Sequence, residues 1–478
     1  MSTRKSLIFS FLDRYASLAI SIGSSMVIAR LLTPAELGVY SVTMVLLMFV
    51  SSVRDLGAGS YLVQERDLTS DKIKAVWAIQ LGLGFILAIL VIIASYPAAL
   101  FYQEPRMQNI MLVIALNYII NPFGSLTYAW LMREMRFESV ALIRFASAVT
   151  GAATSIVLAL QDFGPISLAI GSLISTLTNA MAATYFRPAH FPWSPGIKEI
   201  KTVLSFGSKI SLSSIINVAS GGAPELMLGK FQNIASVGYY SRANGLVQMF
   251  SRLITDAVGS VCLPWFSKIN REKGSISESF LRATAYVTVI GWSFCIFVAV
   301  MADPIIRMLY GPQWDASANL ARLLAAATVF NVPTTLCGVA ILSVGAVSQI
   351  VRITIFNAAI NISFVAVASA YSLTAVCIAA IAASFLNMIF NLRVVCKTTK
   401  TPKLALLNTL KASALVVPFV AVGPFFALYY FGAHPNNIII PLLLSTVAAI
   451  GGFMAGTFFT GHQIIKEFKQ IYKQMMPT

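Results

Sequence analysis

Basic side chains occur inside long apolar stretches of this 478-residue sequence, where ionic groups are rare. An ionised side chain is costly in such surroundings, and where it is present it usually marks a binding site or a pathway. Four of these residues lie deep in their stretches, namely Arg14, Lys209, Arg242 and Arg252. Arg144 and Arg352 lie about one helical turn from an end. Their chemistry would be to draw an anionic group into a hydrated cavity.

Six further basic residues lie near the ends of their stretches, where long side chains can reach lipid headgroups. They are Arg30, Arg54, Arg282, Arg307, Arg322 and Lys411. The acidic residues in the same stretches are Asp13, Asp55, Glu225, Asp256 and Asp303. The interior is therefore net positive. Arg252 and Asp256 are four residues apart on one helical face, so a local ion pair is an alternative explanation for both.

A stripe of polar residues accompanies two of these charges. In the first stretch it comprises Ser6, Ser10, Asp13, Ser17, Ser21 and Ser24, and in the seventh it comprises Lys209, Ser213, Asn217 and Gly221. Steps of three and four residues place each set on one face of a helix. A seam of small residues for close helix packing would explain the serines. Because such a seam needs no charges, Asp13 and Lys209 favour two equivalent helices that line one aqueous cavity, with Asp256 on a third.

The elements that position these residues are transmembrane helices. The sequence is 57% hydrophobic and 11% charged, with a mean hydropathy of +0.79, whereas soluble domains average about 25% charged residues. About 20 helical residues cross a bilayer. We therefore predict an all-α polytopic membrane protein with about 14 spans, centred on residues 7–31, 37–61, 75–100, 108–130, 140–159, 167–185, 203–228, 238–265, 281–308, 318–343, 351–369, 374–392, 405–430 and 439–461. Asp13 and Arg14 interrupt the first apolar run, so we expect a retained first helix and not a signal peptide.

Basic residues in the links between spans predict the orientation. Links on one side hold 20 basic residues and links on the other side hold two, Arg106 and Lys230. Because cytoplasmic links carry the excess of Lys and Arg, both termini are predicted to be cytoplasmic, in the cell inner membrane. Residues 64–74, 187–201 and 393–403 would then face the cytoplasm, and residues 32–36 and 432–437 would face outward. The short links leave no room for a soluble catalytic domain between spans.

The sequence also contains an internal repeat. Ala35, Gly38, Tyr40 and Ser41 recur 200 residues later, and Arg144 and Arg352 coincide at a shift of 208. Because both halves enter the membrane in the same direction, the repeat is parallel. We predict one six-helix bundle in residues 1–200, a second in residues 201–400, and helices 13 and 14 with a basic tail in residues 401–478.

Other kinds of site are not indicated. The five cysteines lack CxxC spacing and lie in or beside apolar stretches, which is typical of small buried residues. The three histidines lie far apart in the sequence, so no metal site or catalytic base is predicted. The net charge of +16 is concentrated at helix ends and forms no face with interleaved aromatics, so nucleic acid is not an expected partner. No cofactor motif or catalytic motif occurs, so we expect a protein that is not an enzyme.

Four segments carry a resemblance to a known family: Ala29–Tyr40, Asp55–Gln64, Leu131–Phe137 and Val237–Ala243. They resemble the polysaccharide-transporter branch of the multidrug/oligosaccharidyl-lipid/polysaccharide exporter superfamily, and in particular Wzx-type flippases of colanic-acid and succinoglycan-like exopolysaccharides. The resemblance extends to about residue 400. The last two spans resemble the family only in their apolar character.

The resemblance implies a function. It implies two bundles facing a central cavity, and a flippase that moves undecaprenyl-diphosphate-linked oligosaccharides across the inner membrane by alternating access, for exopolysaccharide, O-antigen or capsule biosynthesis. The interior basic residues would bind the diphosphate, because an uncompensated charge in hydrocarbon costs several kcal/mol. Membrane lipids, a polysaccharide polymerase and export machinery are the implied partners. The sugar, and coupling to Na⁺ or H⁺, are left open.

The sequence leaves three alternative functions to compare with a flippase of this kind. A cation-coupled drug exporter of the same superfamily would use intramembrane carboxylates, yet basic residues outnumber acidic ones here. A membrane polymerase usually needs a long outward loop, which the sequence lacks. A peptidoglycan-precursor flippase is physically almost identical, and only its substrate separates it.

Overall fold

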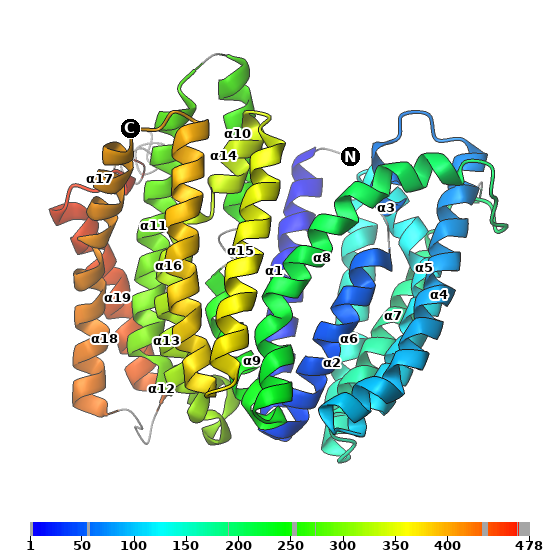
Figure 1. Ribbon diagram of the computed structural model, residues 1–478, viewed down its shortest axis with the longest axis horizontal. Helices are drawn as coiled ribbons and strands as arrows, with labels where there is room; N and C mark the ends of the chain where they lie inside the picture. The colour runs from blue at the N-terminus through cyan, green and yellow to red at the C-terminus, as the bar shows by residue number, and fades with distance from the viewer. Residues whose placement is uncertain are drawn as a thin grey trace. The chain divides into compact units, whose positions relative to one another are not determined.

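The structure is a computed structural model (Figure 1) that describes residues 3–54, 58–189, 191–250, 256–272, 274–432, 438–465 and 467. Within helices, the side chains of residues 3–14 and 204–214 are among those outside this description. The contacts divide the chain into an N-terminal unit, residues 1–238, and a C-terminal unit, residues 239–478. The regular elements of the described residues are all helices. The predicted all-α class is therefore confirmed.

The N-terminal unit contains the helices α1 (Thr3–Leu31), α2 (Pro34–Arg54), α3 (Ala58–Gln64), α4 (Ser70–Tyr102), α5 (Arg106–Arg133), α6 (Phe137–Leu160), α7 (Ile166–Tyr185), α8 (Ile200–Phe231) and the start of α9 (Ile234–Phe250). Helix α5 packs against both α4 and α7, α6 packs against α7 and α1, and α8 packs against α2. Thr69 caps the N-terminus of α4, where its hydroxyl accepts a hydrogen bond from the Lys72 backbone N–H over 3.4 Å.

The C-terminal unit contains the rest of α9, then α10 (Asp256–Arg271), α11 (Ile276–Val300), α12 (Ala302–Tyr310), α13 (Ala316–Asn331), α14 (Cys337–Ser343), α15 (Val347–Ser369), α16 (Leu373–Thr398), α17 (Lys403–Ala414), α18 (Val417–Phe431) and α19 (Ile439–Phe459). Two 3₁₀ turns, Pro312–Trp314 and Val332–Thr334, lie among them. Helix α13 packs on α16, α16 on α15, and α18 on α19. All five cysteines are buried in this unit, as the sequence predicts.

Eleven helical segments of the described residues are long and apolar enough to cross a membrane. The chain is therefore a multi-pass membrane protein. The other three predicted spans coincide with α1, α8 and the pair α9–α10. Helices α1 and α8 include the two polar stripes, and the three spans together include four of the six basic residues predicted for the site. A total of 14 spans stays a prediction.

Three spans that were predicted as single helices contain a break. The predicted spans 281–308, 318–343 and 405–430 break near Pro304, Pro333 and Pro418. Proline fits the first turn of a helix but removes the hydrogen bond that would continue the preceding one. Each of these three spans is therefore built from two α-helices, and the apolar segments Ala316–Ser343 and Lys403–Phe431 are still long enough to cross a membrane. Within the predicted 37–61 span, the described residues form α2 and the start of α3, and residues 55–57 lie outside the description.

The 200-residue repeat is visible in the helix boundaries. Helix α1 ends at Leu31 and α8 ends at Phe231, while α2 begins at Pro34 and α9 begins at Ile234. Equivalent positions therefore adopt the same helix–turn–helix geometry. The division into residues 1–200, 201–400 and 401–478 stays a prediction.

Candidate functional site

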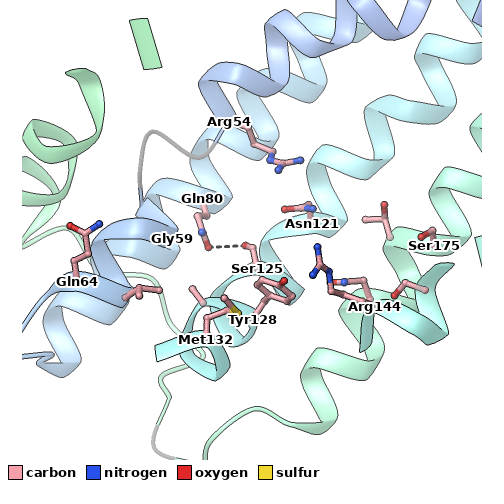
Figure 2. Close-up of a pocket in the computed structure, with 15 residues that line it drawn as sticks. Arg54, Gly59, Gln64, Gln80, Asn121, Ser125, Tyr128, Met132, Arg144 and Ser175 are labelled. Carbon is pink, nitrogen blue, oxygen red and sulfur yellow. Dashed lines mark hydrogen bonds between the residues drawn. The ribbon is translucent and has the colours of Figure 1, made fainter. Parts of the chain in front are cut away.

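A cavity of about 680 Å³ lies inside the N-terminal unit (Figure 2). Its lining residues come from α3, α4, α5, α6 and α7 and from the end of α2. They are Arg54, Gly59, Val63, Gln64, Gln80, Asn121, Ser125, Tyr128, Ala129, Met132, Arg144, Ser147, Ser175, Thr176 and Asn179. Pockets for small ligands are usually about 300–1,000 Å³ in volume. The size and the polar lining are those of a ligand site.

Two guanidinium groups give the cavity its charge. Arg54 is the last residue of α2, and Arg144 lies in the second turn of α6. None of the described residues that line the cavity is a carboxylate. Arginine presents a planar fork of donors that matches carboxylate and phosphate groups. The cavity is therefore suited to an anionic ligand.

Amide and hydroxyl groups make up the rest of the polar lining. Gln80 on α4 is only 3% exposed, and its side-chain oxygen accepts a hydrogen bond from the Ser125 hydroxyl of α5 over 3.0 Å. Within the described part of the chain, the side chains of Asn121, Tyr128 and Asn179 make no hydrogen bond. Polar groups at membrane depth are costly without partners. These groups therefore require water or a ligand in the cavity.

The spacing along α5 explains how one helix supplies several of these groups. Asn121, Ser125, Tyr128 and Met132 follow one another at steps of four and three residues, which places them on one face. Gly124 lets α7 approach this face, because a Cβ atom at Gly124 would lie 2.7 Å from the Asn179 Oδ1 atom. Close approach through small residues is a common way to pack membrane helices.

Three of the six basic residues predicted for the site have described side chains, and they lie in different surroundings. Arg144 lines the cavity. In the C-terminal unit, the Arg242 guanidinium carbon lies 5.4 Å from the Tyr310 ring centroid and 5.7 Å from that of Trp314. The Arg352 guanidinium carbon lies 5.7 Å from the Phe390 ring centroid. The structure thus places Arg242 and Arg352 at separate aromatic contacts.

The remaining predicted residues divide into described and undescribed side chains. The Asn217 side chain is exposed on α8, and the Ser17 side chain is partly buried on α1. The side chains of Arg14, Lys209, Arg252, Asp13, Ser213 and Asp256 lie outside the described part of the structure. Their role in a cavity stays a prediction.

Three residues expected to reach lipid headgroups form ion pairs in the C-terminal unit. Arg307 bonds to both carboxylate oxygens of Asp315, at 2.7 and 2.5 Å. Arg322 pairs with Asp303, and Arg282 pairs with Glu467 over 2.8 Å. Asp315 and Glu467 lie outside the predicted spans, so they neutralise two basic residues that the acidic residues within the spans do not balance. Arg54 was expected to lie at a headgroup, and the structure places it in the cavity instead.

Tyr128 and the amides that line the cavity were not among the site residues predicted from the sequence. The available signal was the occurrence of Gln80, Asn121 and Asn179 within otherwise apolar spans. Burying a polar side chain in a membrane span costs free energy, as burying a charge does, although the amount is smaller. Such a side chain is therefore also an indication of a binding site. The site residues predicted from the sequence were instead charged residues and members of the polar stripes on two helices.

The sequence has recognisable relatives. Residues 27–319 match a protein family described as polysaccharide biosynthesis protein. An uncharacterised membrane protein in the cps region of Klebsiella pneumoniae is 22% identical over 320 residues, which cover 66% of this chain and 65% of that protein. The succinoglycan biosynthesis transport protein ExoT of Rhizobium meliloti (strain 1021) is also 22% identical over 320 residues, covering 66% of this chain and 64% of ExoT. The chain thus spans slightly less than two thirds of the length of these relatives.

A solved structure shows the same fold. The lipid II flippase MurJ, in an inward closed conformation, superposes with a TM-score of 0.76 at 15% sequence identity. The alignment covers 97% of this chain and 100% of that structure. Both the family match and the shared fold agree with the resemblance that the sequence segments had indicated.

Proposed function

Since the chain belongs to the polysaccharide biosynthesis protein family, we propose that it is a flippase that carries undecaprenyl-diphosphate-linked oligosaccharides across the inner membrane. The observation that carries the proposal is the cavity with two guanidinium groups and no carboxylate among its described lining residues. A diphosphate cannot enter hydrocarbon without compensation of its charge. Arg54 and Arg144 supply that compensation inside the N-terminal unit.

The position of the cavity fits loading from the cytoplasm. Gln80 lies ten residues into α4, about 15 Å along the helix from Ser70. With both termini cytoplasmic, as the basic links favour, the cavity lies in the cytoplasmic half of a hydrocarbon layer about 30 Å thick. The diphosphate and its sugars would enter there, and the polyprenyl tail would stay in lipid.

We propose alternating access as the transport mechanism, because parallel repeats in transporters commonly rock about a fixed site. The repeat is supported here by the matching helix ends at Leu31 and Phe231. Coupling to Na⁺ or H⁺ is not part of the proposal. The short links between the helices favour a transporter over a polymerase, and the cationic lining favours an anionic substrate over the organic cations of drug exporters.

The test is complementation of a strain from which the gene has been deleted. The strain should accumulate a lipid-linked oligosaccharide in the cytoplasmic leaflet, and the wild-type gene should restore polysaccharide export. Arg54→Gln with Arg144→Gln should reduce export at equal membrane protein levels. Lys268→Gln, at a side chain that is 66% exposed, is the matched control and should export normally.

Two outcomes would contradict the proposal. Normal export by the doubly neutralised protein would show that the cavity does not hold the diphosphate. Accumulation of a peptidoglycan precursor in place of a polysaccharide repeat unit would assign the protein to the other flippase class.

A further inference from the structure

Besides the two arginines, the cavity is lined by neutral polar side chains. They include Gln80 on α4, Asn121 and Tyr128 on α5, and Asn179 on α7. We propose that these four residues form a sugar-binding subsite, which holds a neutral or acidic monosaccharide of the oligosaccharide by its hydroxyl groups. This inference rests on the proposed function and adds a determinant of substrate specificity to it.

Gln80 is the first indication of a sugar-binding subsite. Its side chain is almost completely buried, and the Ser125 hydroxyl fixes its amide orientation by donating to the side-chain oxygen over 3.0 Å. With the oxygen engaged, the amide nitrogen has two N–H groups to donate. Within the described residues this nitrogen makes no hydrogen bond. A buried, oriented donor that lines a cavity requires an acceptor from outside the protein.

Asn121, Tyr128 and Asn179 are the second indication of this subsite. Each lines the cavity, and none forms a hydrogen bond with the described part of the protein. Figure 2 shows Asn121 and Tyr128 among the side chains that line the cavity. A sugar attached to an anionic group in this cavity can therefore form hydrogen bonds with these side chains.

The chemistry of these groups matches a sugar. Amide side chains donate and accept, as sugar hydroxyls do, so each amide can satisfy two adjacent hydroxyls. Tyr128 adds an aromatic face for the apolar C–H surface of a pyranose ring and a phenol for hydrogen bonding. Because no carboxylate occurs among the described lining residues, the subsite offers no ion pair to a sugar with a free ammonium group. Neutral and acidic sugars remain.

The test compares two ligands that differ only in the sugar. Purified full-length protein is incubated with the lipid extract of the deletion strain, to which undecaprenyl diphosphate has been added, and the bound lipids are measured by native mass spectrometry. Asn121→Ala and Asn179→Ala should lower the ratio of bound glycolipid to bound undecaprenyl diphosphate by about tenfold each, since each removes hydrogen bonds to the sugar. Binding of undecaprenyl diphosphate should stay within about twofold of wild type.

Asn117→Ala is the matched control. Asn117 lies one turn before Asn121 on α5, donates to the Ser172 hydroxyl over 3.1 Å and does not line the cavity. Its ratio should equal that of wild type. If an alanine variant does not fold, Asn121→Leu keeps the branched side-chain shape without its hydrogen-bonding groups and should give the same loss.

The outcomes separate this inference from the proposed function. An unchanged ratio in the Asn121 and Asn179 variants, or an equal loss of both lipids, would overturn the sugar subsite while the flippase proposal stands. If wild-type protein binds neither lipid, or if no glycolipid accumulates in the deletion strain, both proposals are overturned.

Discussion

Gly38 and Gly238 make the same contact in opposite directions. A Cβ atom at Gly38 would lie 1.9 Å from the carbonyl oxygen of Ile234, and a Cβ atom at Gly238 would lie 2.0 Å from that of Pro34. Pro34 and Ile234 are the first residues of α2 and α9. Both pairs are related by a shift of 200 residues, so the repeat produces a contact with approximate two-fold symmetry, in which each partner presents the same surface.

This relationship predicts that neither glycine tolerates a side chain. Gly38→Ala and Gly238→Ala should each destabilise the protein by about 1–3 kcal/mol, because a methyl group at either position overlaps a backbone carbonyl that cannot move independently. Thermal unfolding of the purified protein would measure the loss. Gly245→Ala on α9 is the control, because a Cβ atom there meets nothing within 4 Å. Alanine has a higher helix propensity than glycine, so Gly245→Ala should not destabilise the protein. A loss of equal size at Gly245 would show that the backbone contact is not the cause.

The overall architecture was largely accessible from the sequence. Apolar stretches of bilayer length predict helices because lipid leaves few other structures possible, and repeated residues such as Gly38 and Gly238 predict equivalent geometry. The interruptions at Pro304, Pro333 and Pro418 were also encoded locally. They were missed because hydropathy continues across a break that only the backbone chemistry of proline reveals.

The candidate site was less accessible. Its polar groups come from α4, α5 and α7, which pack closely together at positions such as Gly84 and Gly124. The position of Arg54 depends on where α2 ends and on the fold of α3, which hydropathy does not specify. Arg144 was selected because it recurs in the repeat as Arg352, yet the two residues have different neighbours. A repeat preserves helix geometry more strictly than it preserves a binding site.

An aromatic contact holds the segment between α7 and α8. The Arg187 guanidinium carbon lies 3.9 Å from the Trp193 ring centroid and 5.1 Å from that of Trp77 on α4, and Nη2 donates to the Pro192 carbonyl oxygen over 2.7 Å. We expect Arg187→Ala to destabilise this segment by about 0.5–2 kcal/mol through loss of the cation–π contacts. Limited proteolysis within residues 187–199 should then accelerate.

Lys198→Ala is the control for this contact. The Lys198 side chain is 80% exposed, and its 3.6 Å ion pair with Asp71 is a surface pair of little energetic value. Its cleavage rate should match that of wild type. Equal acceleration in both variants would assign the effect to lost positive charge and not to the aromatic contact.

The segment between α3 and α4 carries a pH-dependent interaction. The Lys72 ammonium group, 3.0 Å from Glu65 Oε1, lowers the pKa of the Glu65 carboxyl below its ordinary value of 4.5. Stabilisation from the ionised carboxylate is thus present above pH 4.5 and is lost as the pH falls through the lower pKa of the folded protein.

Glu65→Gln should remove this dependence. The difference in thermal midpoint between wild type and the variant should be constant above pH 4.5 and should shrink at lower pH. Lys72→Gln should raise the pKa of the Glu65 carboxyl toward its ordinary value, so the loss of stability should begin at a higher pH. A difference that grows as the pH falls would contradict the assigned direction of the pKa shift.

The predicted orientation can be tested by labelling single cysteines in intact cells. Lys198→Cys and Lys400→Cys should react with a membrane-impermeant thiol reagent only after the cells are broken, whereas Gln161→Cys should react in intact cells. The native cysteines are buried and should give little background. Labelling of position 198 from outside would contradict the positive-inside assignment and the 14-span arrangement that depends on it.

The last prediction concerns the three deepest basic residues, Arg14, Lys209 and Arg252. If they face a water-filled path for a diphosphate, neutralising each should weaken export and leave the fold intact, because a charged group in such a path contributes little packing energy. Lys209→Gln keeps most of the side-chain stem, so lost packing is a small effect. Arg14→Lys and Arg252→Lys keep the charge and lose the bidentate fork, and should reduce export less than neutralisation if simple attraction dominates.

Export in the deletion strain, normalised to the amount of protein in the membrane, is the measurement for these three residues. Glutamine at position 14, 209 or 252 should reduce export at a normal protein level. A parallel loss of export and of protein would instead indicate that the charges stabilise the helices. Arg252 carries an additional test, because Asp256 lies one turn further on. If Arg252 serves only to neutralise Asp256, Asp256→Asn should restore the export lost in Arg252→Gln. If Arg252 binds the diphosphate, the double variant should export no better than Arg252→Gln alone.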